Sequence, residues 1–315
     1  MSVVIPAFNA GRWVARAIDS VLAQDWPNVE VIVVNDGSTD NTDEVCRSYG
    51  ERIRYVRQEN AGVSAARNRG IELAEGQLIA FLDADDQFLP SMVSTLVRAL
   101  ENFPEAGAAS GAHFLRTGDS LVRVPPEGRV LPPGVKIGVV HDFFRVYAKW
   151  SIAWTGSVLV KKEVFDKVGL FRPDLRLGED IEMWSRIAGR FPWVFVDEPV
   201  AVYNRNPESS VTMRSRLSFD FSFIYDEDEM RKQVREELWV GYRVFRREQI
   251  LMRCRYLLKY GATGEVRAAL RRISPAPPTF EWLMINVLSF FPPWMAKTVA
   301  YSVINLKRIK RRLLR

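Results

Sequence analysis

Three aspartates follow directly after a short apolar run in the first third of the chain. The run is residues 77–82, and the carboxylates belong to Asp83, Asp85 and Asp86. Its apolar continuity predicts a buried strand, and open α/β sheets bind ligands beyond the carboxyl ends of their strands. Mg²⁺ is bound by oxygen ligands, commonly carboxylates together with substrate phosphates. The pattern therefore predicts a binding site for a metal-bound diphosphate. The plainer alternative is an acidic turn that caps the helix starting near Pro90.

A second acidic pair, Glu179 and Asp180, precedes apolar residues that recur on one face of a helix. Those apolar residues are Ile181, Trp184, Ile187 and Ala188. The pair therefore lies at a helix N-terminus, where carboxylates interact favourably with the helix macrodipole by about 0.3–1 kcal/mol. Capping is sufficient to explain the pair when it is taken alone.

Strands and helices alternate in the part of the chain that must position the first acidic cluster. Strand composition marks residues 2–5, 29–34, 53–56 and 77–82. Helical spacing connects Val14, Ile18, Val21 and Leu22, and residues 40–49 and 63–74 are also helix-like. This order predicts an α/β fold with a mainly parallel sheet flanked by helices. It places the chemistry in the loops that follow the strands.

The loops after the first two strands contain residues suited to binding a nucleotide. The first strand runs into Pro6, Ala7, Phe8 and Asn9, and the second ends in residues 35–40. Asp36 can accept hydrogen bonds from a base, although a turn with a helix cap would use the same residues. Arg67 lies on the third predicted helix. Arginine is the usual bidentate partner of phosphate. An exposed arginine, however, commonly has no partner other than water.

Four ordered motifs together resemble glycosyltransferase family 2. They are Val4–Asn9, Val34–Asp40, Ala66–Asn68 and Phe81–Asp86, and the resemblance extends over roughly residues 2–212. Members of this family are inverting enzymes of the GT-A fold that use nucleotide-activated sugars. A dehydrogenase is disfavoured because no Gly-x-Gly-x-x-Gly follows the first strand. The Gly-rich N-terminal loop of sugar nucleotidyltransferases is absent as well.

The resemblance implies a donor-binding role for the residues of the first three loops. Pro6, Ala7 and Asn9 would line the pocket for the base and the ribose. Asp36 would read the edge of the base, most often uracil in this family, and Arg67 would approach the donor.

The resemblance also implies a metal site at the strand-end aspartates. Asp83 and Asp85 would straddle the ribose and a Mn²⁺ or Mg²⁺ ion, and either Asp85 or Asp86 would coordinate that ion; the sequence leaves this choice open. Many family members carry a histidine a few residues after the tyrosine that follows the last core strand, whereas this chain has Asn206 after Tyr203. Loss of that ligand puts the metal affinity in question.

The family's acceptor half corresponds to residues 151–212. Inverting transfer is a single displacement in which an acceptor hydroxyl attacks while the nucleoside diphosphate leaves, so a carboxylate must take the hydroxyl proton. Asp180 matches the family's position for this base. Glu179, Trp154 and Trp184 are candidates for acceptor contacts, since aromatic faces stack on sugar rings, although tryptophan is also a common core residue.

The family resemblance ends near residue 212, which implies a catalytic domain at residues 1–212 followed by a further region at residues 213–315. Charge is unevenly distributed between these two parts. Residues 1–211 carry 23 basic and 28 acidic side chains, whereas residues 212–315 carry 21 basic and 10 acidic ones. Such an asymmetry points to a basic appendage that meets an anionic surface.

The basic region reads as helices followed by an apolar segment. Helical patterns occupy residues 226–260 and 265–273, and a Pro-rich hinge follows at 274–278. Residues 282–306 are strongly apolar, and their Pro292-Pro293 pair argues against one spanning helix. We expect two short helices in the membrane interface, supported by six basic residues between 307 and 315. A dimerisation arm is the alternative, and a nucleic-acid tail is disfavoured because the basic run is short.

Composition narrows the expected function further. There are two histidines, which disfavours His-centred metal sites, and two distant cysteines, which favour a reducing compartment without a disulfide framework. We expect no secretory signal, because the first strand begins at residue 2. We expect a peripheral enzyme on the cytoplasmic face of the membrane that moves a sugar from a UDP-sugar to a lipid-linked or surface-polysaccharide acceptor. A soluble transferase with a dimerisation arm and a non-catalytic, sugar-nucleotide-binding membrane scaffold are the alternatives; the donor sugar, acceptor and linkage stay open.

Overall fold

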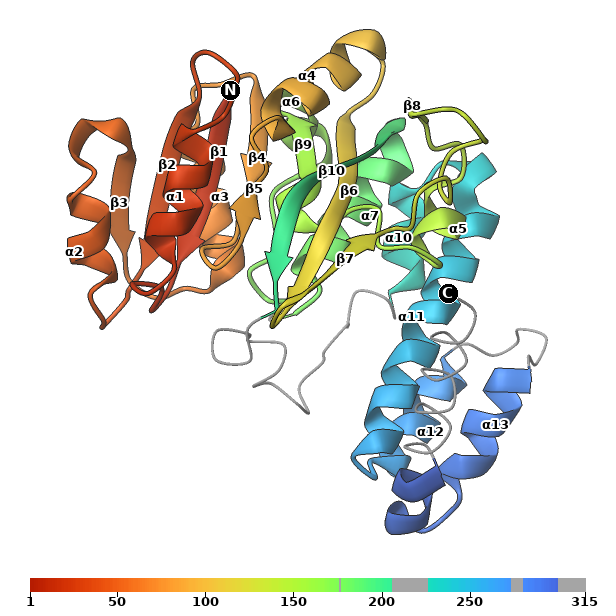
Figure 1. The fold of residues 1–315 in the computed structure, drawn as a ribbon. Helices are drawn as coiled ribbons and strands as arrows, with labels where there is room; N and C mark the ends of the chain where they lie inside the picture. Colours follow the sequence, from red (N-terminus) through yellow and green to blue (C-terminus); the bar gives the residue numbers. More distant parts are fainter. Residues whose placement is uncertain (176, 206–225, 273–279, 300–315) are drawn as a thin grey trace. The chain divides into compact units, whose positions relative to one another are not determined.

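The computed structural model describes residues 1–175, 177–205, 226–272 and 280–299. The chain forms two compact units, residues 1–241 and 242–315 (Figure 1). The predicted domain boundary at residue 212 lies outside the described residues, and it stays a prediction.

The first half of the sheet is parallel, as the alternation of strands and helices predicted. Its strands run in the order β3-β2-β1-β4, with β1 at Ser2–Ala7, β2 at Glu30–Asp36, β3 at Arg54–Gln58 and β4 at Leu78–Phe81. The connecting helices are α1 (Val14–Leu22), α2 (Thr42–Arg47) and α3 (Val63–Leu73). Each observed element overlaps its predicted one and ends within a few residues of it.

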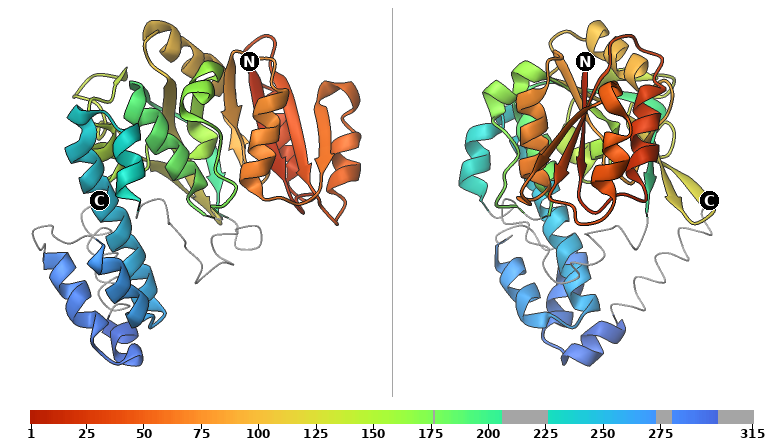
Figure 2. Two further views of the ribbon diagram at one scale, coloured as in Figure 1. Left: turned by 180° about the vertical axis from the view of Figure 1, so that it is seen from behind. Right: turned by 90° about the vertical axis from the view of Figure 1, so that its left-hand side faces the viewer.

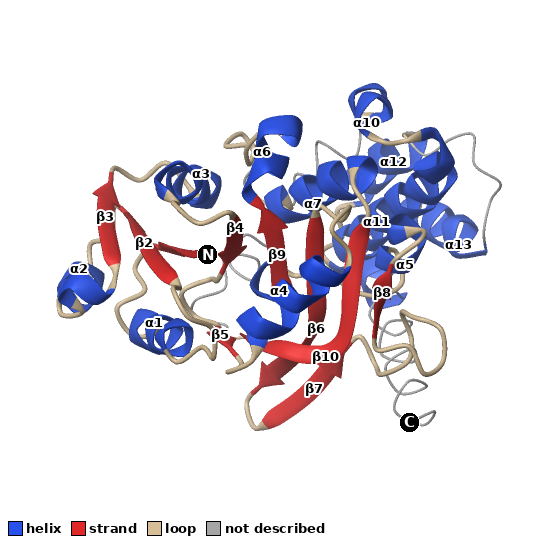
Figure 3. Cartoon of the chain, turned by 90° about the horizontal axis from the view of Figure 1, so that it is seen from above, coloured by secondary structure: helices blue, strands red, loops and turns tan. Residues whose placement is uncertain are grey.

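Helices cover both faces of these strands, which explains why β1 is buried along its whole length. Figure 3 shows α1 and α2 on one face and α3 on the other. Successive β1 side chains alternate between the faces: Val3 and Ile5 join the core beneath α1, whereas Val4 faces α3. A Cβ at Gly70 would lie 2.1 Å from Cγ1 of Val4, so α3 can approach β1 this closely only with a glycine there.

The second half turns the sheet into a mixed one. Its elements are β5 (Gln87–Phe88), α4 (Met92–Asn102), β6 (Ala108–Thr117), β7 (Ser120–Val124), β8 (Ile137–Val139), α5 (Phe143–Tyr147), η2 (Thr155–Ser157), β9 (Val158–Lys161), α6 (Lys162–Val168), α7 (Glu179–Arg190) and β10 (Trp193–Asn204). Strand β9 inserts antiparallel between β4 and β6, and β6 pairs parallel with β10. The two-residue turn between β6 and β7 also requires antiparallel strands. The α/β class with flanking helices is confirmed, and its sheet is mixed beyond β4.

The C-terminal part of the chain is helical, as predicted. Its helices are α10 (Glu227–Gln233), η3 (Glu236–Leu238), α11 (Trp239–Lys259), α12 (Thr263–Arg271) and α13 (Phe280–Ser289), and residues 293–299 are helical as well (Figure 2). The single helix predicted for 226–260 is interrupted after Gln233, because the backbone N–H of Arg235 turns to the Gly189 carbonyl at the end of α7.

The second unit has a small apolar core of its own, which includes Phe245, Leu251, Cys254, Leu258, Val266, Leu270, Ile285 and Leu288. Among the described residues, no helix is long and apolar enough to cross a membrane. The predicted hinge at 274–278 and the basic residues from 307 onward lie outside the described ranges.

Candidate active site

The loops after β1 and β2 are tied together by Asn9, as a shared pocket requires. Asn9 adopts a left-handed backbone with φ of 49°. Its backbone N–H donates to Oγ of Ser38 at 2.9 Å, and its side-chain oxygen accepts from the Thr39 N–H at 2.8 Å. Pro6 and Ala7 are buried at the end of β1, immediately before this junction. Four of the predicted donor residues, Pro6, Ala7, Asn9 and Asp36, thus come from adjacent strand ends.

Asp36 already has protein partners. Its buried carboxylate accepts from Nε2 of Gln58 at 2.7 Å and from the backbone N–H groups of Ala61 and Gly62 at 2.9 and 2.8 Å. Asp36 therefore anchors the turn that leads into α3. An ionised carboxylate offers about four acceptor sites, so about one remains for the N–H of a base. The base-reading role predicted for Asp36 stays a prediction.

Asp86 is the deeply buried member of the strand-end cluster. Its Oδ1 accepts from the Asn204 backbone N–H at 2.7 Å, while its Oδ2 has no hydrogen-bond partner in the described part of the chain. Burial raises the pKa of Asp86 well above its ordinary value, and the neighbouring Asp85 and Asp83 raise it further. A buried carboxylate oxygen without a partner is costly, and a cation bound there would relieve that cost.

Asp85 is half-buried on the same turn, which the end of β10 holds in place. The Asp85 carbonyl accepts from Nη2 of Arg16 at 2.7 Å and from Nδ2 of Asn204 at 2.9 Å. The sequence reasoning considered Asn206, which lies outside the described residues, and missed Asn204. Asn204 could have been considered from the sequence, because it directly follows Tyr203 in the stretch that was searched for a polar ligand.

The aspartates suit a cation that is shared with a substrate diphosphate. Mg²⁺ is commonly held by one or two carboxylates, with substrate phosphates and water completing its shell. Asp86 offers its unpartnered oxygen, and Asp85 lies beside it. In the ranges the structure describes, no three His, Cys, Asp or Glu side chains converge as a complete metal site, so the donor would have to supply ligands.

Arg67 connects the strand-end cluster to the second acidic pair. Its side chain is 3% exposed, and it donates to Oδ1 of Asp83 at 2.9 Å and to Oε1 of Glu179 at 2.8 Å. Burial alone would lower the pKa of Arg67, but these two carboxylates outweigh it and raise the pKa. The guanidinium also lies 5.4 Å from the centre of the Phe171 ring. The end of β4 and the start of α7 are therefore joined by one buried cation.

Asp180 is the second residue of α7, directly after Glu179. Its carboxylate accepts from Oγ1 of Thr155 at 3.2 Å and from the Ile181 N–H at 2.7 Å. Burial and the neighbouring Glu179 raise the pKa of Asp180 to about 6, against the opposing effects of Arg67 and the Ile181 amide. The residue keeps some surface exposed. A carboxylate with a pKa near neutrality suits proton abstraction.

An aromatic pair adjoins the strand-end aspartates. The Trp154 ring stacks on Tyr203 with 5.1 Å between centroids and 25° between planes. Burial and the charge of Asp86 raise the pKa of Tyr203 to about 12. Trp154 is half-buried, and its ring covers Gly156, where a Cβ would lie 2.4 Å from Cη2. Trp154 can therefore offer an edge to an acceptor.

Trp184 fits the core alternative instead of an acceptor contact. It is 0% exposed and packs against Phe81, Phe171 and Trp193. Helical periodicity alone could not distinguish these two uses, because both place the ring on the same face of α7. His113, which sequence reasoning passed over, lies 5.0 Å from the Trp154 ring, and burial lowers its pKa to about 4.

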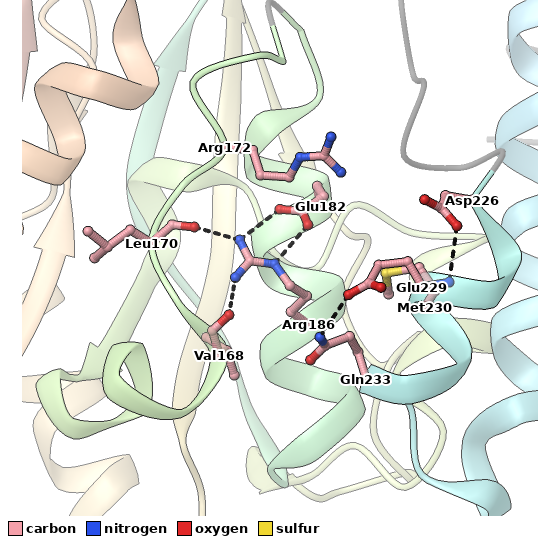
Figure 4. A pocket seen from close by; sticks show the side chains of 9 residues that line it. All are labelled: Val168, Leu170, Arg172, Glu182, Arg186, Asp226, Glu229, Met230 and Gln233. Carbon is pink, nitrogen blue, oxygen red and sulfur yellow. Dashed lines mark hydrogen bonds and ion pairs between the residues drawn. The ribbon is translucent and has the colours of Figure 1, made fainter.

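A second buried arginine, Arg186 on α7, holds the segment that follows α6 (Figure 4). Arg186 donates to both carboxylate oxygens of Glu182 at 2.7 and 2.8 Å, and to the carbonyls of Val168 and Leu170. It lines a cavity of about 350 Å³ beside α10. The adjacent Phe171 exchanges two backbone hydrogen bonds with the Asn68 side chain on α3. The hydrogen bonds of Arg186 and Asn68 thus fix the segment that contains Phe171, whose ring lies against Arg67.

Comparison with known proteins identifies the family. The model for "Glycosyl transferase family 2" matches residues 2–169. The chain belongs to this family. The matched range includes Asp36, Arg67 and the strand-end aspartates, but it ends before Glu179 and Asp180.

Two similar curated proteins are described as uncharacterized glycosyltransferases. The chain is 37% identical to "Uncharacterized glycosyltransferase YibD" of Escherichia coli over 188 residues, which is 56% of this chain and 54% of that protein. It is 30% identical to "Uncharacterized glycosyltransferase EpsJ" of Bacillus subtilis over 230 residues, which is 70% of this chain and 65% of that protein. The matches thus span about half to two thirds of the relatives' length.

Solved structures share the GT-A fold of this family 2 chain. Staphylococcus aureus TarS 1–349 in complex with UDP-GlcNAc superposes with a TM-score of 0.66 at 15% identity, covering 98% of this chain and 91% of that one. Mannosyltransferase PcManGT from Pyrobaculum calidifontis, in complex with GDP-Man and Mn²⁺, superposes with a TM-score of 0.56 at 19% identity, covering 97% and 86%. These likenesses confirm the predicted fold class.

Proposed function

We propose that this family 2 glycosyltransferase moves a sugar from a UDP-sugar, with inversion, to a lipid-linked or surface-polysaccharide acceptor at the cytoplasmic face of the membrane. One observation carries the catalytic part of the proposal. Arg67 pairs with Asp83 at the predicted donor site and with Glu179 beside Asp180. One buried side chain therefore connects the predicted donor site to the residue next to the candidate base.

Asp180 would act as the general base. The acceptor oxygen forms a bond to the anomeric carbon while the bond from that carbon to the diphosphate oxygen breaks. The acceptor's hydroxyl proton passes to the Asp180 carboxylate. With a pKa of about 6, Asp180 is ionised at neutral pH and still basic enough to take the proton. Trp154, stacked on Tyr203, would orient the acceptor sugar.

The donor would occupy the loops after β1, β2 and β4. Pro6, Ala7 and Asn9 would enclose the base and ribose, and the remaining acceptor site of Asp36 would bind a base N–H. UDP is our choice because TarS has been solved with UDP and with UDP-GlcNAc. Arg67, held by two carboxylates, would contribute by fixing Asp83.

Asp85 and Asp86 are the residues that would hold a Mn²⁺ or Mg²⁺ ion. Such an ion supplies charge neutralisation on the leaving diphosphate. The Mn²⁺ in the mannosyltransferase complex and the unpartnered oxygen of Asp86 support this part of the proposal.

The second unit supports a location at the membrane surface. Residues 242–315 carry 16 basic and 3 acidic side chains. Each basic side chain near an anionic bilayer contributes at most about 1 kcal/mol, so a cluster of them is needed for binding. The enzyme would be peripheral and would meet lipid-linked acceptors at that surface.

Release of UDP from a panel of UDP-sugars, with and without Mn²⁺, tests the catalytic proposal on the full chain. Wild-type protein should hydrolyse at least one UDP-sugar slowly in the absence of acceptor, and Asp180→Asn should not. UDP binding without any turnover, with every sugar nucleotide and with membrane extract as acceptor, would instead favour the non-catalytic scaffold.

A further inference from the structure

An apolar ridge runs along the exposed side of α13 and the helical residues after it. It consists of Leu283, Val287, Phe290 and Trp294, which are 47%, 53%, 70% and 70% exposed. Leu283 and Val287 lie four residues apart, on one side of α13. Phe290 directly follows the last turn of α13, and Trp294 lies in the next helical segment, residues 293–299. Ile285 and Leu288 point the other way and are buried, in the part of α13 that packs against α12.

The four ridge residues are exposed, whereas other apolar residues of the same segment, Ile285 and Leu288, are buried in the core of the second unit. Large apolar side chains that gather on one surface mark a contact with another molecule or a membrane. Phe290 and Trp294, the two most exposed members, flank Pro292 and Pro293. Aromatic side chains of this kind are favoured at the depth of lipid headgroups.

The surroundings of the ridge are basic. Arg267 on α12 donates to the Ser289 carbonyl, and its guanidinium lies 5.5 Å from the centre of the Phe290 ring. Arg271, one turn further along α12, and Lys297, three residues after Trp294, are both exposed. The acidic Glu281 is paired with Arg255 at 2.6 Å. An incoming surface therefore meets apolar groups bordered by positive charge.

We infer that this ridge inserts into the headgroup region of an anionic bilayer, with Arg267, Arg271 and Lys297 over the lipid phosphates. The inference rests on the membrane location in the proposed function and assigns the residues that make the contact. An amphipathic segment lies in the plane of the interface and buries its apolar side to a depth of a few ångströms, about 5–10 Å. The short α13 and its proline break suit this shallow binding.

Charge favours a bilayer over a second copy of the chain as the occupant. The second unit has a net charge of +13, from 16 basic and 3 acidic residues. Two ridges facing each other would bring these like charges together, whereas an anionic surface neutralises them.

Vesicle co-sedimentation of the full chain tests the assignment. Vesicles of phosphatidylcholine alone and of phosphatidylcholine mixed with phosphatidylglycerol separate the apolar from the electrostatic contribution. The double variant Phe290→Ser/Trp294→Ser should lower the partition coefficient by on the order of ten- to a hundred-fold on the mixed vesicles, because it removes two buried aromatic side chains. Lys297→Gln should lower it by about five-fold on the mixed vesicles and not on neutral ones.

Leu121→Ser is the matched control, since Leu121 is an exposed apolar residue on β7 of the first unit. It should leave vesicle binding unchanged, and every variant should keep its UDP-induced thermal shift. Wild-type affinity of the double variant would overturn the ridge assignment while leaving the membrane location standing. No vesicle binding by wild-type protein would refute both. A wild-type dimer in sedimentation velocity that the double variant converts to monomer would assign the ridge to self-association instead.

Discussion

Replacing Asp180 by asparagine should slow turnover and stabilise the fold at the same time. The pKa of Asp180 is raised from 3.8 to about 6, mainly by burial. One pH unit corresponds to about 1.4 kcal/mol, so ionising Asp180 costs the folded protein on the order of 3 kcal/mol. Asparagine keeps the shape and cannot ionise, so it avoids this cost.

The stabilisation should depend on pH in a defined window. Because the folded-state pKa lies above the unfolded one, the wild type has its full stability below pH 3.8 and loses it as pH rises through about 6. The difference in unfolding free energy between Asp180→Asn and wild type should therefore be near zero at the acid end. It should grow between those two values and stay constant above them.

Urea unfolding of both proteins across this range measures the difference directly, and other titrating groups cancel in the subtraction. UDP release in native buffer at neutral pH should show turnover reduced by on the order of 10²–10⁴-fold in Asp180→Asn, with UDP affinity nearly unchanged. Asp174→Asn is a suitable control, because Asp174 is exposed and Arg172 lowers its pKa. Asp174→Asn should leave turnover unchanged and should not stabilise the fold. A less stable Asp180→Asn protein at neutral pH would refute the desolvation argument, and unchanged turnover would refute the role as base.

Three further outcomes are expected. Wild-type UDP release should decline as pH falls below about 6, when Asp180 is protonated; a pH profile that is flat from neutrality to pH 5 (roughly one unit below that pKa) would contradict this. UDP with Mn²⁺ should stabilise the wild type by roughly 2.7 kcal/mol in total when UDP is at about 100 times its dissociation constant. Asp85→Ala should abolish the part of this stabilisation that depends on Mn²⁺; a thermal shift like that of wild type argues against a metal there. Arg67→Ala should destabilise the fold by about 3–5 kcal/mol, because it leaves Asp83 and Glu179 without their buried cation; urea unfolding measures this, and a loss below 1 kcal/mol, the range of exposed pairs at about 0–1 kcal/mol, would contradict the buried bridge.

Local patterns were sufficient to predict most of the elements and the place of the donor site. Apolar continuity over 77–82 and the alternation of strands with helices depend on neighbours in sequence, so strands β1 to β4 and helices α1 to α3 were expected close to where they are. The parallel order followed, because such alternation buries both sheet faces. The strand-end position of Asp83, Asp85 and Asp86 followed in turn from the direction of the strand.

Contacts between distant segments were not predictable in this way. Arg67 is separated by 112 residues from Glu179, and no spacing rule connects the two. Asp36 was expected to face a base, but the Gln58 side chain and the backbone of Ala61 and Gly62 together use most of its acceptor capacity. The break after Gln233 depends on a bond to Gly189, which helical periodicity in 226–260 does not reveal.

The sequence by itself determined which residue types stand at the strand ends and at the start of α7, because those positions follow from short-range periodicity and chain direction. Only the tertiary structure decided what each of them can do. Burial separates Trp184 in the core from the half-exposed Trp154, and it raises the pKa of Asp180 to about 6. Both effects depend on how much water the packed chain excludes from a side chain, and that quantity does not exist before segments far apart in sequence have come together.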